Sequence, residues 1–330
     1  MRFLSLLLAW WLLTVAALTA GRAAETKPAA PTPAERFTFV ALGCMPYGES
    51  DYASYERLLA EISRHHPAFT VHCGDTKAGA AAMTDDFLPR VRDWFNSVAG
   101  AVIYTPGDNE WTDVHRTGQD PLVWLNKIRE LYFAQERSLG QQPIPLVTQR
   151  RDAAFAKFVE NARWSRGNVV FATLHMVGSN NNCNPTNPVA MQEFRERDAA
   201  NTAWIRATFA EARATQAAGV ALFFQAQPLG GAVAGRESGF AQFRATMEEE
   251  ARVFARPVLL VHADEHRYRL ETPIRFRAGA EAVANVTRLE TFGAKDLHAV
   301  IVTVDANSPQ VFLGGPLLVP GNALPVLPLK

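Results

Sequence analysis

Side chains that can ligate metal ions recur along this chain of 330 residues, each time just after a short apolar run. They are carboxylates, amides and imidazoles, which suit divalent Zn, Mn or Fe. Two such ions roughly 3.5–4 Å apart can clamp a phosphate and activate water as a nucleophile. The positions are Asp75, the segment 108–110 (Asp-Asn-Glu), His175 and the segment 262–266 (His-Ala-Asp-Glu-His).

Each of these motifs also has an ordinary interpretation. Gly74-Asp75 and the Gly-Asp-Asn sequence at 107–109 are common in turns. A single histidine such as His175 is more often a polar residue at a strand end than a ligand. The segment 262–266 is a stronger signal, because alternate residues of an extended segment point the same way. The repeated placement after strands, and not any one motif, predicts a metal site.

The apolar runs predict the elements that position these side chains. Strands alternate with helices, which predicts right-handed crossovers and parallel strands. In such a sheet, ligands bind where the loops converge at the carboxyl ends of the strands. We expect one domain over residues 37–330. The expected strands are 37–42, 69–73, 101–104, 169–174, 220–225, 257–261, 297–304 and 310–313; the expected helices are 52–65, 87–97 and 193–217, with 121–166 mostly helical.

The order of the motifs resembles that of the calcineurin-like metallophosphoesterases. That family carries Asp-x-His, Gly-Asp, Gly-Asn-His-Asp/Glu, a lone His and Gly-His-x-His, in this order. The tail at 286–305 is similar to the closing strands of secreted bacterial members. The resemblance covers residues 37–270, with matching stretches LGCMPYG (42–48), HCGDTKAG (72–79), YTPGDNEWTD (104–113), ATLHMVGSNNN (172–182) and LLVHADEHRYRL (259–270).

The resemblance implies a fold and an activity. The fold is a four-layer α/β/β/α sandwich of two mixed sheets with a dinuclear metal site at the sheet edge. The activity is hydrolysis of phosphate mono- or diesters through a metal-activated hydroxide, on a small phosphoester substrate. Lys77 and Arg116 are candidates to hold a phosphate oxyanion.

The resemblance also implies roles for single residues. Asp75 matches the aspartate that bridges the two metals. Asp108 stands where the metal-binding Asn would be, and Asn109 where a histidine assists the leaving group. A slip of one residue makes Asn109 the ligand instead, and both registers stay open.

The two later motifs supply the remaining ligands. His175 matches the lone His ligand. In the last motif Asp264 falls on the first His and His266 on the second, and His262 lies beside the motif as an alternative ligand. These positions complete the predicted metal site.

The first motif departs from the family pattern. Cys44 replaces its Asp and Pro46 its His, so a soft thiol that suits Zn but not Mg or Mn replaces a hard carboxylate. Asn109 cannot deliver a proton, and general acid–base catalysis contributes typically about 10²–10⁴-fold. The alternative is therefore a catalytically impaired protein of the same fold, which holds one metal or a phosphorylated ligand without turnover.

The three cysteines leave further alternatives. Neighbouring strands lie about 4.8 Å apart, within the range that a disulfide tolerates. Cys44 can pair with Cys73 or with Cys183, and either bond would remove the thiolate from the metal site. Otherwise Cys73 is a small buried apolar residue.

The N-terminus predicts export. Residues 1–24 combine Arg2, an apolar run and small residues, as in a signal peptide, and the Pro/Ala-rich segment 25–36 is typical of a linker. We expect a periplasmic or secreted protein; the alternative is an uncleaved membrane anchor. With 33 basic and 33 acidic residues and no Lys/Arg block, nucleic-acid binding is not indicated.

Overall fold

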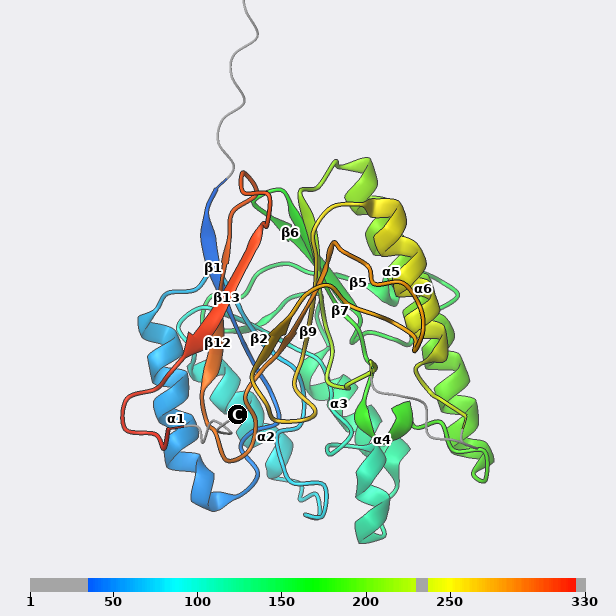
Figure 1. Ribbon diagram of the computed structural model, residues 1–330. Helices are drawn as coiled ribbons and strands as arrows, with labels where there is room; N and C mark the ends of the chain where they lie inside the picture. The colour runs from blue at the N-terminus through cyan, green and yellow to red at the C-terminus, as the bar shows by residue number, and fades with distance from the viewer. Residues whose placement is uncertain (1–34, 230–236, 325–330) are drawn as a thin grey trace, which may run out of the picture. The chain divides into compact units, whose positions relative to one another are not determined.

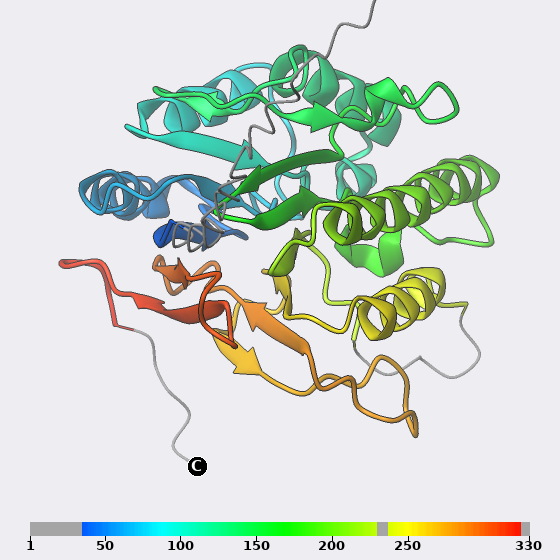
Figure 2. The same ribbon diagram turned by 90° about the horizontal axis from the view of Figure 1, so that it is seen from above.

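Two mixed β-sheets lie face to face, and helices pack against their outer faces (Figures 1 and 2). The computed structural model describes residues 35–229 and 237–324. The predicted signal peptide at 1–24 and most of the predicted linker lie outside these residues. No helix within the described ranges is both long and apolar enough to cross a membrane. The predicted four-layer sandwich of two mixed sheets is confirmed.

The first sheet has the order β13-β12-β1-β2-β3-β4. Its centre is parallel, since β1 pairs with β2 and β2 with β3 in parallel register, while β12, β13 and β4 add antiparallel pairs. The strands are β1 (Phe37–Leu42), β2 (Thr70–His72), β3 (Ala101–Tyr104), β4 (Leu139–Gly140), β12 (Ala299–Val304) and β13 (Phe312–Leu317).

The second sheet has the order β10-β11-β9-β8-β7-β6-β5. The four strands β7, β8, β9 and β11 run parallel, and the others are antiparallel to their neighbours. The strands are β5 (Val147–Thr148), β6 (Ala162–Arg166), β7 (Val169–Thr173), β8 (Gly219–Phe223), β9 (Val258–His262), β10 (Arg269–Glu271) and β11 (Val286–Glu290).

Helices cover the outer faces. Tyr55, Phe95 and Tyr132, from α1, α2 and α3, contact His72 or Tyr104 on the outer face of the first sheet. Helices α5 and α6 run side by side and pack on the second sheet (Figure 1). The helices are α1 (Glu49–Arg64), α2 (Phe87–Ser97), α3 (Pro121–Tyr132), α4 (Gly178–Asn181), α5 (Pro188–Ala214) and α6 (Ala241–Phe254), with 3₁₀ turns η1 (Thr112–Thr117) and η2 (Gln149–Arg151).

Aromatic side chains fill the space between the sheets. Phe39 of β1 lies 6.0 Å from Phe171 of β7 and 5.5 Å from Phe223 of β8, measured between ring centroids. Phe69, just before β2, lies 5.3 Å from Trp164 of β6. Offset and edge contacts of this kind add to the free energy of apolar burial. They fix the two sheets to one another, and with them the strand ends that carry the candidate ligands.

The expectation of mostly helical structure over 121–166 was wrong beyond Tyr132. Residues 133–166 contain the strands β4, β5 and β6 instead. Gly140, Pro143 and Pro145 interrupt any helix there, since proline lacks the amide hydrogen and clashes with the preceding turn. The helix α6 was not predicted from the sequence.

Candidate metal centre

Three carboxylates converge beyond the carboxyl ends of β2, β3 and β9. Asp75, Asp108 and Asp264 offer oxygen atoms that all lie within 4.8 Å of one another. Two glycines allow the first two loops to pack: a Cβ at Gly74 would lie 2.4 Å from the backbone nitrogen of Gly107, and one at Gly107 would lie 2.1 Å from Asp75 Oδ1. The Gly-Asp pairs of the sequence are therefore required for the close approach of Asp75 to Asp108.

Neutral groups hold the carboxylates in place. The backbone amide of Asn109 donates to Asp75 Oδ1 at 3.0 Å. The side-chain amide of Gln225, just beyond β8, donates to Asp75 Oδ2 and to Asp264 Oδ1, both at 3.0 Å. Asp108 Oδ2 accepts from the Ser179 hydroxyl at 2.8 Å. No arginine or lysine forms an ion pair with any of the three carboxylates among the described residues, so their charges are not neutralised by a cationic side chain.

Burial and mutual repulsion disfavour the ionised form of the cluster. Burial raises the pKa of Asp75 well above its usual range, and the charge of Asp108 raises it further. Burial, together with Asp113 and Asp264, raises the pKa of Asp108 to about 7. Burial also raises the pKa of Asp264. A cation between the three groups would favour their ionised forms, because it replaces repulsion by attraction.

These residues fit a divalent cation. The donors are carboxylate oxygens from three separate loops, and hard cations take such ligands. Within the described part of the chain no histidine joins this group of ligand atoms, so its chemistry departs from the imidazole-rich site that the sequence predicts. Asp75, Asp108 and Asp264 are the residues that would hold the ion.

Cys44 and Tyr47 flank Asp75. The Cys44 thiol lies 3.6 Å from Asp75 Oδ2, and burial raises the pKa of this thiol well above its usual range, with the nearby carboxylates adding to the shift. The Tyr47 hydroxyl lies 3.3 Å from the same oxygen and 3.0 Å from Nε2 of His266. The thiol is therefore a neutral neighbour of the carboxylates. His266 is linked to Asp75 through the Tyr47 hydroxyl, which contacts both residues.

Asn109 binds protein groups on both sides. Its side-chain amide donates to the Tyr47 hydroxyl at 3.2 Å and to the Lys77 carbonyl at 2.9 Å. The Lys77 ammonium donates back to the Asn109 carbonyl at 2.8 Å. Asn109 therefore lies at the edge of the centre, and Asp108, not Asn109, joins the carboxylate group.

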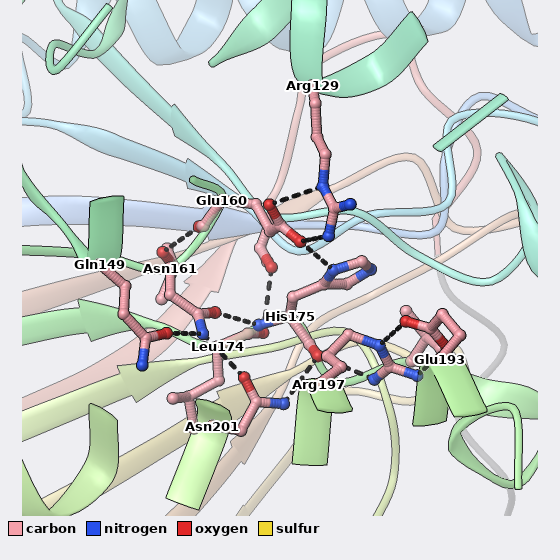
Figure 3. A network of polar contacts seen from close by, with 12 residues as sticks. Arg129, Gln149, Glu160, Asn161, Leu174, His175, Glu193, Arg197 and Asn201 are labelled. Atoms are coloured by element: carbon pink, nitrogen blue, oxygen red, sulfur yellow. Dashed lines mark hydrogen bonds and ion pairs between the residues drawn. The ribbon is translucent and has the colours of Figure 1, made fainter. Parts of the chain in front are cut away.

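His175 lies in a different network, together with Arg197 and Asn201 of α5 (Figure 3). Its Nδ1 lies 2.7 Å from Glu160 Oε1, and Glu160 also binds Arg129. Burial opposes ionisation of Glu160, but Arg129 and His175 outweigh it and hold the pKa of this carboxyl well below its usual range. The ionised Glu160 must accept, so the hydrogen of His175 is on Nδ1, and Nε2 has no hydrogen-bond partner among the described residues.

His262 also faces charged residues away from the carboxylates. Its Nε2 accepts from Arg288 Nε at 2.8 Å, and its ring stacks on Phe224 at 5.9 Å. Burial and the charge of Arg288 lower the pKa of His262 well below its ordinary value. The hydrogen is therefore on Nδ1, and the imidazole is neutral. Of the segment 262–266, Asp264 alone joins the group.

Neither of the possible disulfides of Cys44 forms. Cys44 and Cys73 are free and buried. The register places Cys73 beside Gly43, where a Cβ would approach the Cys73 Cβ to 3.1 Å, while the amide of Cys44 donates to the Gly74 carbonyl at 2.8 Å. The chain beyond β1 and β2 therefore places Cys73 against Gly43 and not against Cys44, which itself has a φ of 53°.

Two cavities adjoin the centre. One, of about 350 Å³, is lined by residues that include Tyr47, Tyr52, Lys77 and Arg90. The other, of about 410 Å³, is lined by residues that include Asp113, Arg116 and Ser179. The Arg116 guanidinium pairs with Asp113 at 2.7 Å and its side chain is 49% exposed, so it can still contact a phosphate oxygen.

Two residues of the centre escaped the sequence analysis. Gln225 is the last residue of the predicted strand 220–225, whereas β8 ends at Phe223, so the predicted strand included the residue that lies beyond the strand end. Tyr47 lies in the stretch LGCMPYG, three residues after Cys44. Neither side chain is a strong metal ligand, so neither residue type indicates a metal site in the sequence.

Comparisons with known proteins show the fold. No protein-family model matches the sequence, and no curated protein matches it. Among solved structures, a dimetal phosphatase from Danio rerio is similar over 87% of this chain and 100% of its own, with 11% identity and a TM-score of 0.54. The structure of PhoD is similar over 85% of this chain and 65% of its own, with 11% identity and a TM-score of 0.52. The chain therefore has the fold of the metallophosphoesterases, as predicted.

Proposed function

We propose that this chain is an exported, metal-dependent phosphoesterase that hydrolyses small phosphate mono- or diesters. The observation that carries the proposal is the convergence of Asp75, Asp108 and Asp264 within 4.8 Å at the carboxyl ends of parallel strands. The fold supports it, since the similar structures include a dimetal phosphatase. Because fold alone does not confer function, the carboxylates carry the argument.

The oxygen donors favour a hard ion, and we propose Mn²⁺ as the probe metal. When bound, a divalent cation supplies a Lewis acid for the phosphoryl oxygens and lowers the pKa of water. Cys44 is a neutral thiol beside Asp75, so it does not supply the hard ligand for Mn²⁺ that a carboxylate at this position would supply. One ion per chain therefore agrees better with the donor set than two.

The chain's own residues would bind and orient the ester. Arg116, on the open side of Ser179, is placed to contact a phosphate oxygen, and arginine is well suited to this geometry. Asn109 and Tyr47 form a hydrogen-bonded pair beside Asp75, and both are neutral donors. His266, in contact with Tyr47, is an imidazole at this edge that can exchange a proton with a leaving group.

A second candidate function is binding of one cation or phosphorylated ligand without turnover. The placement of His175 and His262 favours it, because Glu160 and Arg288 engage these two imidazoles away from the carboxylates. A centre without them has fewer ligands for a second ion. The two candidates differ in turnover.

The test combines metal counting with hydrolysis. Protein loaded with Mn²⁺ is analysed by mass spectrometry for metal and assayed on 4-nitrophenyl phosphate and bis(4-nitrophenyl) phosphate. The phosphoesterase predicts turnover that Asp75→Asn abolishes and that the exposed control Asp85→Asn leaves unchanged. Bound metal without turnover would support the binding protein, and neither metal nor turnover would refute both. Export is tested by the N-terminus of the mature protein, which should begin near residue 25.

A further inference from the structure

The segment His175–Asn182, which follows β7, has an unusual backbone. Ser179, Asn180, Asn181 and Asn182 have φ values of 48°, 57°, 56° and 60°, four consecutive residues in the left-handed region. Asparagine enters this region more easily than other residues with side chains, but a run of four persists only where the surroundings hold it. The surroundings of this segment therefore define its shape.

The same segment touches the metal centre at two points. The backbone amide of Gly178 donates to Gln225 Oε1 at 2.5 Å, which turns the amide nitrogen of Gln225 towards Asp75 and Asp264. The next residue, Ser179, donates to Asp108. A Cβ at Gly178 would lie 2.7 Å from Asp108 Oδ2, so the backbone packs directly on this carboxylate. The segment thus sets the orientation of groups around all three carboxylates.

One buried arginine of α5, Arg197, forms hydrogen bonds with the segment, beginning at His175 (Figure 3). Arg197 Nη1 donates to the His175 carbonyl at 3.0 Å and to Asn181 Oδ1 at 2.5 Å, and Nη2 donates to the Asn181 carbonyl at 3.0 Å. Glu193, one turn earlier on the helix, pairs with the guanidinium at 2.7 Å. The Arg197 side chain is fully buried. Its hydrogen bonds join both ends of the segment.

His175 is the fixed end of the segment. Its amide donates to Asn161 Oδ1 at 2.7 Å, and its carbonyl accepts from Asn201 as well as from Arg197. With its ring bound to Glu160, every polar group of this residue except Nε2 has a partner within the described ranges. The residue predicted as a metal ligand is therefore an anchor of the loop that shapes the centre.

We propose that Arg197 is a positioning residue of the metal centre, acting through the segment His175–Asn182 on Gln225 and Asp108. The inference rests on the proposed function, since it concerns the affinity of that centre for metal. Among the described residues Arg197 donates to Glu193, His175 and Asn181, and to none of the three carboxylates. Without its hydrogen bonds the left-handed run relaxes, the Gln225 amide is free to rotate, and Asp108 loses Ser179.

The test compares Arg197→Met and Arg197→Lys with Arg213→Met. Arg213 lies on the same helix and pairs with Glu250 at 2.6 Å, far along the chain from the segment, so its loss also removes an ion pair from α5. Two readouts are measured: the Kd for Mn²⁺ by calorimetry, and hydrogen–deuterium exchange of the peptide covering residues 176–183. Neither readout requires turnover.

Arg197→Met should raise the Kd for Mn²⁺ about 10–100-fold, the range found for partners that orient metal ligands. It should also accelerate exchange over 176–183, with Arg197→Lys intermediate, while Arg213→Met changes neither readout more than about twofold. An Arg197→Met protein that is folded and keeps both wild-type values would overturn the proposal. So would an equal loss of affinity in both methionine variants.

Two further arms keep the result decisive. If Arg197→Met does not fold, Asn181→Gly removes the Oδ1 acceptor while glycine keeps the left-handed backbone without strain, and the same two changes are expected. If the wild-type chain binds no Mn²⁺, the proposed function fails, and the exchange measurement alone decides whether Arg197 holds the segment.

Discussion

Gln225 occupies the position where an added charge should have the largest effect on the centre. Its amide nitrogen lies 3.0 Å from both Asp75 Oδ2 and Asp264 Oδ1, so Gln225→Glu places a carboxylate oxygen against two others. Two unit charges about 3 Å apart repel by about 5 kcal/mol at an effective dielectric constant of 20. Uptake of a proton limits this cost.

The pH sets the free-energy cost of protonating the new glutamate, and this cost is the upper limit of the destabilisation. Protonating a glutamate whose ordinary pKa is about 4.3 costs about 1.36 kcal/mol for each pH unit above that value, or about 3.7 kcal/mol at pH 7. The folded-state pKa of the new glutamate is raised. The electrostatic deficit in unfolding free energy of Gln225→Glu relative to the wild type is therefore absent below the unfolded pKa and grows as the pH rises. Between pH 5 and pH 7.5 the deficit should increase by up to about 3.4 kcal/mol.

Urea unfolding with EDTA, followed by tryptophan fluorescence, measures this deficit at both pH values. Gln225→Met is the control without added charge: it removes the same two hydrogen bonds together with the one from the Gly178 amide, and its deficit should change with pH less than that of Gln225→Glu. Saturating Mn²⁺ should stabilise Gln225→Glu more than the wild type, since the new carboxylate is a further ligand. A deficit in Gln225→Glu that matches the methionine variant at both pH values, with and without Mn²⁺, would refute the geometry of the cluster.

Three other substitutions test separate parts of the structure. Glu160→Gln should lower the free energy of unfolding by about 3 kcal/mol at pH 7, because it leaves Arg129 without its buried partner. Since the pKa of Glu160 is depressed in the folded protein, this difference from the wild type should shrink below pH about 4.5. A difference that stays constant with pH would contradict the ion pair. Gly293→Ala would place a Cβ 2.6 Å from His266 Cγ and so displace the imidazole. Turnover should then fall at least about tenfold while the Kd for Mn²⁺ stays the same. Unchanged turnover would exclude a role for His266. Cys44→Asp should lower the Kd for Mn²⁺ at least about tenfold, as measured by calorimetry, because it replaces a neutral thiol by a hard ligand; an equal or higher Kd would show that the thiol itself serves the ion.

The strand ends were predictable because they depend on local sequence. Short apolar runs followed by Gly-Asp indicate a strand and a turn, and Asp75 and Asp108 lie where these signals place them. The parallel arrangement then brings the two loops to one edge. No knowledge of the second sheet is needed for this part of the centre.

The contribution of the second sheet depends on the order of its strands, which the sequence does not contain. His175 and Gln225 both follow parallel strands, but β8 lies next to β9 and β7 lies one strand further away. Gln225 therefore reaches Asp264, while His175 meets Glu160. Resemblance favoured the imidazole over the amide, because imidazole is the stronger ligand. The partners of His262 and His175 come from β11 and from residues before β6, regions whose pairing is not visible from local pattern.

A crystal structure with Mn²⁺, with the ion located by its anomalous scattering, measures the ligands directly. The proposed centre predicts an ion about 2.0–2.3 Å from oxygen atoms of Asp75, Asp108 and Asp264, with the Nδ1 of His175 still on Glu160. An ion bound instead by His175 or His262, or no ion near the three aspartates at saturating Mn²⁺, would contradict it.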